Sequence, residues 1–345
     1  MEKTYLVIDI GGTFIKYGLI NDQQEFSQLG KLPTPASLGE FLKSLTDLIA
    51  SFASEIKGVG ISCPGQINTQ NGFVHHGGLI PYLKQFPLGT YLETETLFPV
   101  SILNDGDAAG LAEARYGRLS DVSCGAALVL GTGVGGALLV DGELLSLKQV
   151  QTGSLLSKLQ ISQNQPKLAE NGFLATLASV SQLYAHGLES LRTNAGSAVQ
   201  FVERASQEMG LDKADGQEVF QALLEGQSPS LQALFEHYCH EIAYLILNLQ
   251  SIFKLERLVI GGGISSQPLL LEEINRQYQV LLEGNSQFAD LFEPIPILAC
   301  RYHNQANLLG AYCQLKDKLE QPLPGEKDSL PGIFSWLGED KENLK

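Results

Sequence analysis

Positive charge is scarce in this sequence, in which 23 Lys and Arg residues face 38 Asp and Glu residues and give a net charge of −15. The basic residues form no cluster along the chain. A protein that binds nucleic acid usually needs a basic face, because cationic side chains displace counterions from the phosphates. We therefore expect no nucleic-acid partner. An acidic surface of this kind mainly keeps a cytosolic protein in solution.

Cysteine is also scarce, and long apolar runs are missing. The odd number of cysteines and their wide spacing, with no CxxC pair, argue against a disulfide framework and favour buried thiols; they are Cys63, Cys124, Cys239, Cys300 and Cys313. No uncharged apolar stretch approaches the roughly 20 residues that a membrane-spanning helix needs. The chain passes from Met1 into an apolar segment without a signal-peptide pattern. We expect a cytoplasmic protein with no membrane partner.

Glycine, in contrast, is abundant, with 36 residues that gather in short clusters beside apolar runs. Such clusters are typical of tight turns at strand ends, where the backbone needs positive φ or a close approach. The length of 345 residues and the hydrophobic fraction of 44% allow two domains with cores of their own.

The hydrophobic pattern predicts an α/β protein built from two similar halves. Strands are predicted at 5–10, 14–20, 25–32, 59–61, 100–103, 126–130, 137–140, 143–145, 258–260 and 295–299. Helices are predicted at 37–54, 107–115, over most of 174–253, after 261–263 and at 305–318. The order strand, glycine turn, strand, strand, helix begins near residue 5 and again near residue 126, which predicts two halves with a cleft between them.

The first chemical motif is the segment from Asp9 to Thr13, in which a strand leads into Gly11 and Gly12. Missing side chains let backbone N–H groups approach a phosphate, and Thr13 adds a hydroxyl donor. Asp9 can hold Mg²⁺ directly or through water. An ordinary hairpin with a glycine turn would show the same pattern, so this motif alone does not decide the function.

Two further glycine clusters lie in the second half. The run from Gly131 to Gly136 sits between two predicted strands, and without a Walker lysine or a following helix it is neither a P-loop nor a dinucleotide fingerprint. Two glycine hairpins, one of them preceded by an aspartate, together favour phosphate binding more strongly than a single glycine run does. The cluster Gly261 to Gly263 follows a strand, and its backbone can lie against an adenine or a ribose.

Asp105 lies where a predicted strand meets a predicted helix, directly after Asn104. Phosphoryl transfer needs a group that accepts the proton of the attacking hydroxyl, and Asp105 fits that role. Asn104 can hydrogen-bond a neighbouring hydroxyl. The alternative is that Asp105 only caps the helix, but Asp107 is better placed for capping.

In order and spacing, these motifs resemble those of the ROK family (repressor, open reading frame, kinase), over residues 4 to 318. The resemblance implies two ribonuclease-H-like, actin-like ATPase domains that close on ATP and a hexose across an interdomain cleft. It assigns residues 1–117 with about 305–320 to one domain and 118–304 to the other, and the last helix packs back on the first domain. Residues 321–345 are polar and are predicted to form a tail outside the core.

The resemblance implies an ATP-dependent kinase that phosphorylates a sugar, with Asp105 as the base and the C6 hydroxyl of a hexose or hexoside as the acceptor. Mg²⁺, assisted by Asp9, would bridge the phosphates. The residues assigned to ATP are Asp9, Gly11, Gly12, Thr13, Lys16, Gly131, Thr132, Gly133, Gly135, Gly261, Gly262 and Gly263. The residues assigned to the sugar are Asn104, Gly65, Gly78, His76 and Ser154.

The chain departs from the family in its zinc loop. Aligned on the segment that starts at Asn171, the three cysteine positions fall at Pro166, Leu168 and Phe173, and the zinc histidine position falls at Ser157. We therefore expect no structural zinc. The glutamate that contacts the sugar in the family falls at Ser154, and the second glutamate of the family pattern falls at Ala175. The shorter Ser154 would leave room for a substituent, such as a second sugar or an aglycone.

Two alternatives remain open. A degenerate member could bind sugar or nucleotide as a sensor without turnover, which the altered segment 153–157 suggests, although a sensor has no need of Asp105. Another acceptor, such as an amino sugar or a small acid, would differ only in the acceptor pocket. The family resemblance also makes a homodimer an expectation.

Overall fold

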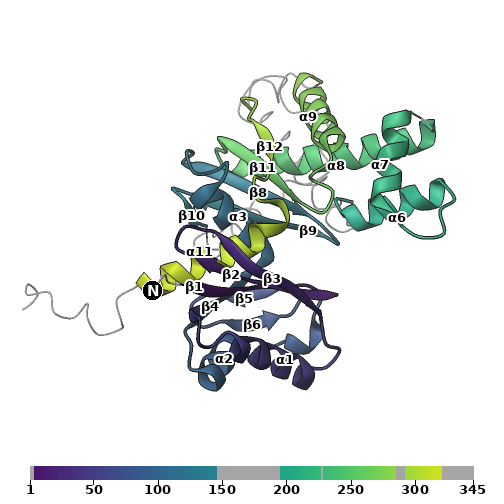
Figure 1. The fold of residues 1–345 in the computed structure, drawn as a ribbon. Coiled ribbons are helices and arrows are strands. Elements are labelled where there is room, and N and C mark those ends of the chain that lie inside the picture. The colour runs from purple at the N-terminus through teal and green to yellow at the C-terminus, as the bar shows by residue number, and fades with distance from the viewer. Residues whose placement is uncertain (1–3, 146–194, 227, 285–291, 321–345) are drawn as a thin grey trace, which may run out of the picture.

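Two five-stranded sheets with the same layout form the framework of the protein (Figure 1). This computed structural model describes residues 4–145, 195–226, 228–284 and 292–320. The first sheet has the order β3-β2-β1-β4-β7 and the second has the order β10-β9-β8-β11-β12. In each sheet the first three strands in sequence are antiparallel neighbours and the last two pair in parallel. The repeat predicted from the glycine turns is therefore present.

The strands are β1 (Thr4–Ile10), β2 (Phe14–Asn21), β3 (Phe26–Pro33), β4 (Ile56–Cys63), β5 (Gln66–Asn68), β6 (Phe73–His76), β7 (Val100–Asn104), β8 (Cys124–Leu130), β9 (Val134–Val140), β10 (Glu143–Leu144), β11 (Arg257–Gly262) and β12 (Ile297–Ala299). The helices are α1 (Leu38–Ser51), η1 (Pro81–Leu83), α2 (Leu88–Thr96), α3 (Asp105–Tyr116), α6 (Ala198–Glu208), α7 (Gly216–Glu225), α8 (Pro229–Ile252), α9 (Pro268–Glu283), η2 (His303–Gln305) and α11 (Ala306–Glu320).

The elements stack in layers, with a helix pair between the two sheets (Figure 1). Helices α1 and α2 bury apolar side chains such as Phe41 and Leu92 against the outer face of the first sheet. Helices α6 to α9 cover the outer face of the second sheet, where Phe235 and Tyr278 are fully buried. Helix α11 packs on the inner face of the first sheet and on α3, and α3 packs on β8 and β9 of the second. The last helix thus lies on the first sheet.

Small residues allow this central helix pair to pack closely. A Cβ atom on Gly310 of α11 would lie 1.9 Å from the backbone oxygen of Ala108 in α3. A Cβ atom on Gly60 of β4 would lie 2.3 Å from the backbone oxygen of Ala311. Any larger side chain at either position would push α11 away from its neighbours.

The predicted α/β class is confirmed, and most predicted elements are present within a few residues of the expected bounds. Strands β4 and β9 begin earlier than the predicted positions 59 and 137, and α3 begins at Asp105 rather than Asp107. The hairpin β5–β6 and helix α2 were not predicted. The predicted tail 321–345 and the start of the predicted helical region, 174–194, lie outside the described residues. No helix in the described ranges is long and apolar enough to cross a membrane.

Candidate active site

Asp9 is buried at the end of β1 and is held by residues from three other elements. Its Oδ1 accepts hydrogen bonds from Ser62 Oγ of β4 at 3.1 Å and from Asn307 Nδ2 of α11 at 3.0 Å. Its Oδ2 lies 3.6 Å from Nζ of Lys16, which faces Asp9 across the β1–β2 pair and is half exposed. These contacts fix the carboxylate in one orientation and place the Lys16 ammonium beside it.

The first glycine turn connects β1 to β2 and presents its tip to solvent. Gly11 N donates to the backbone oxygen of Phe14 at 3.0 Å, which closes the turn. Thr34 Oγ1 donates to Gly11 O at 2.6 Å and braces it from the end of β3. Gly12 and Thr13 are exposed, so their backbone can be reached by a ligand.

The second glycine turn connects β8 to β9 in the same way. Gly131 N donates to Gly133 O at 2.9 Å, and Thr132 and Gly133 are exposed. The following strand β9 lies against the start of α3, because a Cβ atom on Gly106 would lie 2.7 Å from Gly136 N. The fold therefore brings the second glycine hairpin beside the residue that follows Asp105.

Asp105 is the first residue of α3, and its neighbour Asn104 caps the helix. Asn104 Oδ1 accepts from Gly106 N at 2.8 Å, and Asn104 Nδ2 donates to Gly65 O at 2.6 Å. The expectation that Asp107 caps this helix is therefore wrong, because the helix starts earlier and Asn104 fills that role. Burial, together with the negative charge of Asp9, raises the pKa of the Asp105 carboxyl.

Negative charge accumulates around Asp105. Burial and the charge of Asp105 raise the pKa of Asp107 to about 6. Burial, Asp105 and Asp9 together raise the pKa of the Cys63 thiol. Carboxylate oxygens in a negative environment fit Mg²⁺, which prefers oxygen ligands and is usually held by one or two carboxylates, phosphates and water. The described residues contain no group of three His, Cys, Asp or Glu side chains that could hold a metal on their own.

Three of the residues assigned to the sugar gather beside Asp105. Gly65 has φ of +104°, and a Cβ atom there would lie 1.9 Å from His76 O and 2.8 Å from Gly78 N. Only glycine fits at this position. Since Asn104 also bonds Gly65, the end of β7, the turn after β4 and the loop after β6 are tied together. The His76 side chain is exposed, and Ser154 lies outside the described residues.

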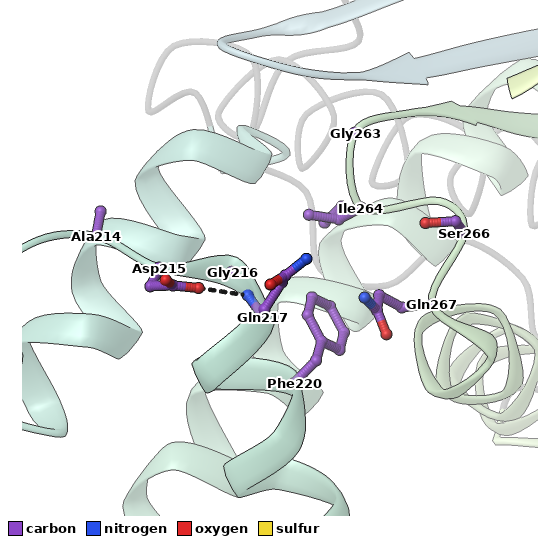
Figure 2. Close-up of a pocket in the computed structure, with 9 residues that line it drawn as sticks. All are labelled: Ala214, Asp215, Gly216, Gln217, Phe220, Gly263, Ile264, Ser266 and Gln267. Atoms are coloured by element: carbon purple, nitrogen blue, oxygen red, sulfur yellow. Dashed lines mark hydrogen bonds between the residues drawn. The ribbon is translucent and has the colours of Figure 1, made fainter. Parts of the chain in front are cut away.

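A pocket of about 340 Å³ lies in the second half, between the start of α7 and the turn from β11 to α9 (Figure 2). Gly263, Ile264, Ser266 and Gln267 form one side, and Ala214 to Gln217 with Phe220 form the other. Asp215 caps α7 by accepting from Gln217 N at 2.8 Å. Of the predicted cluster, Gly263 lines the pocket, whereas Gly262 packs against Leu130.

Sequence reasoning missed several residues that shape this site. Ser62 and Asn307 hold Asp9, Leu79 lies over Gly12, and the start of α7 forms half of the pocket. Leu79 directly follows Gly78, which was assigned to the sugar, so the sequence offered a signal for it. The contact of Asn307 with Asp9 spans 298 positions and has no local pattern. The segment aligned with the zinc loop, including Pro166, Leu168, Phe173, Ser157 and Ala175, lies outside the described residues.

Comparison with known proteins identifies the relatives of this chain. The sequence profile of the ROK family matches residues 5–149 and 192–318. A β-glucoside kinase of Listeria innocua is 28% identical over 306 residues, which cover 88% of this chain and 94% of the relative.

Solved structures share the fold. A ROK family protein of Streptococcus pneumoniae in complex with sucrose has a TM-score of 0.69 at 24% identity. The match covers 92% of this chain and 100% of that protein. A ROK family glucokinase of Streptomyces griseus in complex with glucose and AMPPNP has a TM-score of 0.63 at 21% identity. The match covers 89% of this chain and 97% of the glucokinase.

Proposed function

This chain belongs to the ROK family, and we propose that it is a kinase that transfers the terminal phosphoryl group of ATP to a sugar hydroxyl. One observation carries the proposal. Asp9, which precedes the first glycine turn, lies close enough to Asp105 for its negative charge to raise the pKa of the Asp105 carboxyl. Asp9 and its glycine turn suit the binding of the phosphates, and Asp105 suits the acceptance of the hydroxyl proton. Relatives named as sugar kinases support the same reaction.

The donor side uses both glycine turns and the pocket. The 340 Å³ pocket is large enough for a nucleoside, and Phe220 and Ile264 offer it apolar surface. The exposed backbone at Gly12, Thr13 and Gly133 donates N–H groups to the phosphates. Lys16 adds a positive charge beside Asp9. Asp9 would hold Mg²⁺ directly or through water, and the ion would supply positive charge that neutralises the phosphates.

The acceptor side centres on Asp105. Its carboxylate accepts the proton of the sugar hydroxyl while that oxygen bonds the terminal phosphorus and the bond to the β-phosphate oxygen breaks, which releases ADP. A raised pKa suits this task, because a stronger base accepts the proton more readily. Asn104 bonds Gly65 and Gly106 and so holds the turn after β4 and the start of α3 in place, which adds a structural role to its assigned one.

The acceptor is the C6 hydroxyl of a hexose or hexoside. Ser154, where the family has a glutamate, leaves room for a substituent near the anomeric carbon. A related β-glucoside kinase and a ROK structure with sucrose support a substituted sugar. An amino sugar is the next candidate, since another relative is named N-acetylmannosamine kinase.

Other assignments belong to the same proposal. The domains comprise residues 1–117 with about 305–320, and 118–304. The five free cysteines suit a cytoplasmic location, and a homodimer follows from the family resemblance alone. The sensor alternative is not favoured, because the named relatives are kinases and Asp105 is present.

A panel of sugars assayed for ADP release tests this function. It should contain glucose, mannose, fructose, N-acetylmannosamine and methyl and phenyl β-glucosides. We expect turnover with at least one sugar, with β-glucosides preferred over glucose. Tight sugar binding without ADP release across the panel would instead support the sensor.

A further inference from the structure

Glu113, near the end of α3, is a fully buried carboxylate that accepts hydrogen bonds from three backbone amides. Its Oε2 accepts from Arg118 N at 2.9 Å. Its Oε1 accepts from Arg301 N at 2.6 Å and from Tyr302 N at 3.2 Å. The donors thus come from two chain segments more than 180 residues apart.

These two segments are the places where the described chain passes between the halves. Residues 117–123 connect α3 to β8 of the second sheet, and residues 300–305 connect β12 back to α11. We call them the first and the second crossing. One side chain therefore binds both crossings.

Further contacts fasten the crossings at the same point. The backbone oxygen of Tyr116 accepts from Arg301 Nη1 at 3.2 Å and from Tyr302 OH at 2.9 Å. A Cβ atom on Gly117 would lie 2.3 Å from Glu113 Oε2, so the carboxylate is packed directly under the first crossing. The end of α3 is a shared anchor for both segments.

The second crossing has an unusual backbone immediately beyond this anchor. His303 has φ of +41°, a left-handed conformation that costs free energy for a residue other than glycine. Four residues later, Asn307 bonds Asp9 in the proposed active site. The conformational change of a hinge can therefore be confined to a few residues between Tyr302 and Asn307.

We propose that Glu113 is a positioning residue that ties the two crossings into one pivot, about which the halves rotate when the kinase closes on its substrates. This closure role rests on the proposed function. A carboxylate suits the pivot because both of its oxygens can accept hydrogen bonds, and all three neighbours are backbone donors. A glutamine would turn an NH₂ group toward at least one backbone N–H and lose that bond.

Hydrogen exchange of the full chain tests the pivot without turnover. In the wild type, the amides of Arg118, Arg301 and Tyr302 should exchange with one common opening free energy. In Glu113→Gln, exchange in both crossings should accelerate together by roughly tenfold or more. Glu273→Gln is the matched control, because Glu273 is another buried, hydrogen-bonded carboxylate but lies within α9. It should accelerate exchange in α9 and leave the crossings unchanged.

Acceleration of one crossing alone, or different opening free energies in the wild type, would overturn the pivot. The wild-type measurement decides the matter even if Glu113→Gln does not fold. For the closure role, Glu113→Gln should lower kcat with the panel's best sugar at least about tenfold while ATP affinity stays within about twofold. Equal kcat losses in both variants would overturn that role. A wild type without kinase activity would refute the proposed function and the closure role and leave the exchange result valid.

Discussion

Asn307 Nδ2 donates to Asp9 Oδ1 at 3.0 Å and so connects the start of the last helix to the end of the first strand. The same oxygen accepts from Ser62, so two donors fix the orientation of the carboxylate. The remaining oxygen, Oδ2, faces Lys16 at 3.6 Å.

Replacing Asn307 with leucine should weaken the use of Mg²⁺ and ATP. Without its amide donor, Asp9 loses one of the two bonds that orient it, so we expect KM for MgATP to rise about tenfold with a smaller change in KM for the sugar. Steady-state kinetics at varied MgATP measures this. Asn248→Ala removes a buried asparagine from α8 and should leave both KM values unchanged. Unchanged MgATP kinetics in Asn307→Leu would contradict the role of this contact.

The pH dependence of the reaction should reveal the environment of Asp105. A base acts only when ionised, so activity falls as pH decreases through its pKa. Burial and the charge of Asp9 raise that pKa, which moves the acid limb above the value of about 4 expected for an ordinary aspartate. The profile of kcat/KM for the sugar between pH 4 and 9 checks this. An acid limb at or below pH 4 would contradict the buried environment of Asp105.

Asp107→Asn should stabilise the protein at neutral pH. The pKa of Asp107 is raised to about 6 in the fold, so the folded state binds this proton more tightly than the unfolded state does. Its contribution to stability is present below about pH 4 and is lost as pH rises through 6. At pH 7 the ionised Asp107 lowers the free energy of unfolding by at most about 3 kcal/mol, and Asp107→Asn removes this loss.

Denaturant unfolding at pH 4.5 and 7 measures this effect. We expect the gain of Asp107→Asn to be larger at pH 7. An equal effect at both pH values would show that Asp107 titrates as an ordinary carboxyl.

Two neighbouring glycines should respond differently to substitution. A Cβ atom on Gly262, with φ of +102°, would lie 2.1 Å from Leu130 O, whereas one on Gly263 meets nothing within 4 Å. Gly262→Ala should therefore destabilise the fold by about 2 kcal/mol or more. Gly263→Val should keep the stability within about 0.5 kcal/mol and raise KM for ATP, because it fills the pocket. Thermal unfolding and ATP titration separate the two effects, and normal ATP affinity in Gly263→Val would place the nucleoside elsewhere.

Local patterns were enough to predict the two sheets, because the strands and glycine turns in them depend mainly on consecutive residues. The start of α3 was misplaced because Asn104 and Asp107 are both residue types that cap helices, and spacing alone does not choose between them. Strands as short as Gln66–Asn68 carry too few residues for a periodic signal.

Some predicted site residues lie together, since Asn104 bonds Gly65 and Gly65 lies against Gly78, but their further partners depend on tertiary contacts. Ser62 and Asn307 reach Asp9 only after β4 and α11 have packed on β1. Half of the pocket comes from α7, which is far from the glycines of β11 in sequence. Ser154 lies outside the described residues, and its role stays a prediction.

Direct detection of the phosphorylated product tests the central claim. The wild type and Asp105→Asn are incubated with MgATP and the preferred sugar of the panel, and the sugar phosphate is measured by ³¹P NMR. We expect one phosphate per ADP in the wild type, and in Asp105→Asn a rate lower by at least about a thousandfold with sugar affinity retained. A sugar phosphate formed at a similar rate by Asp105→Asn would contradict the assignment of Asp105 as the base.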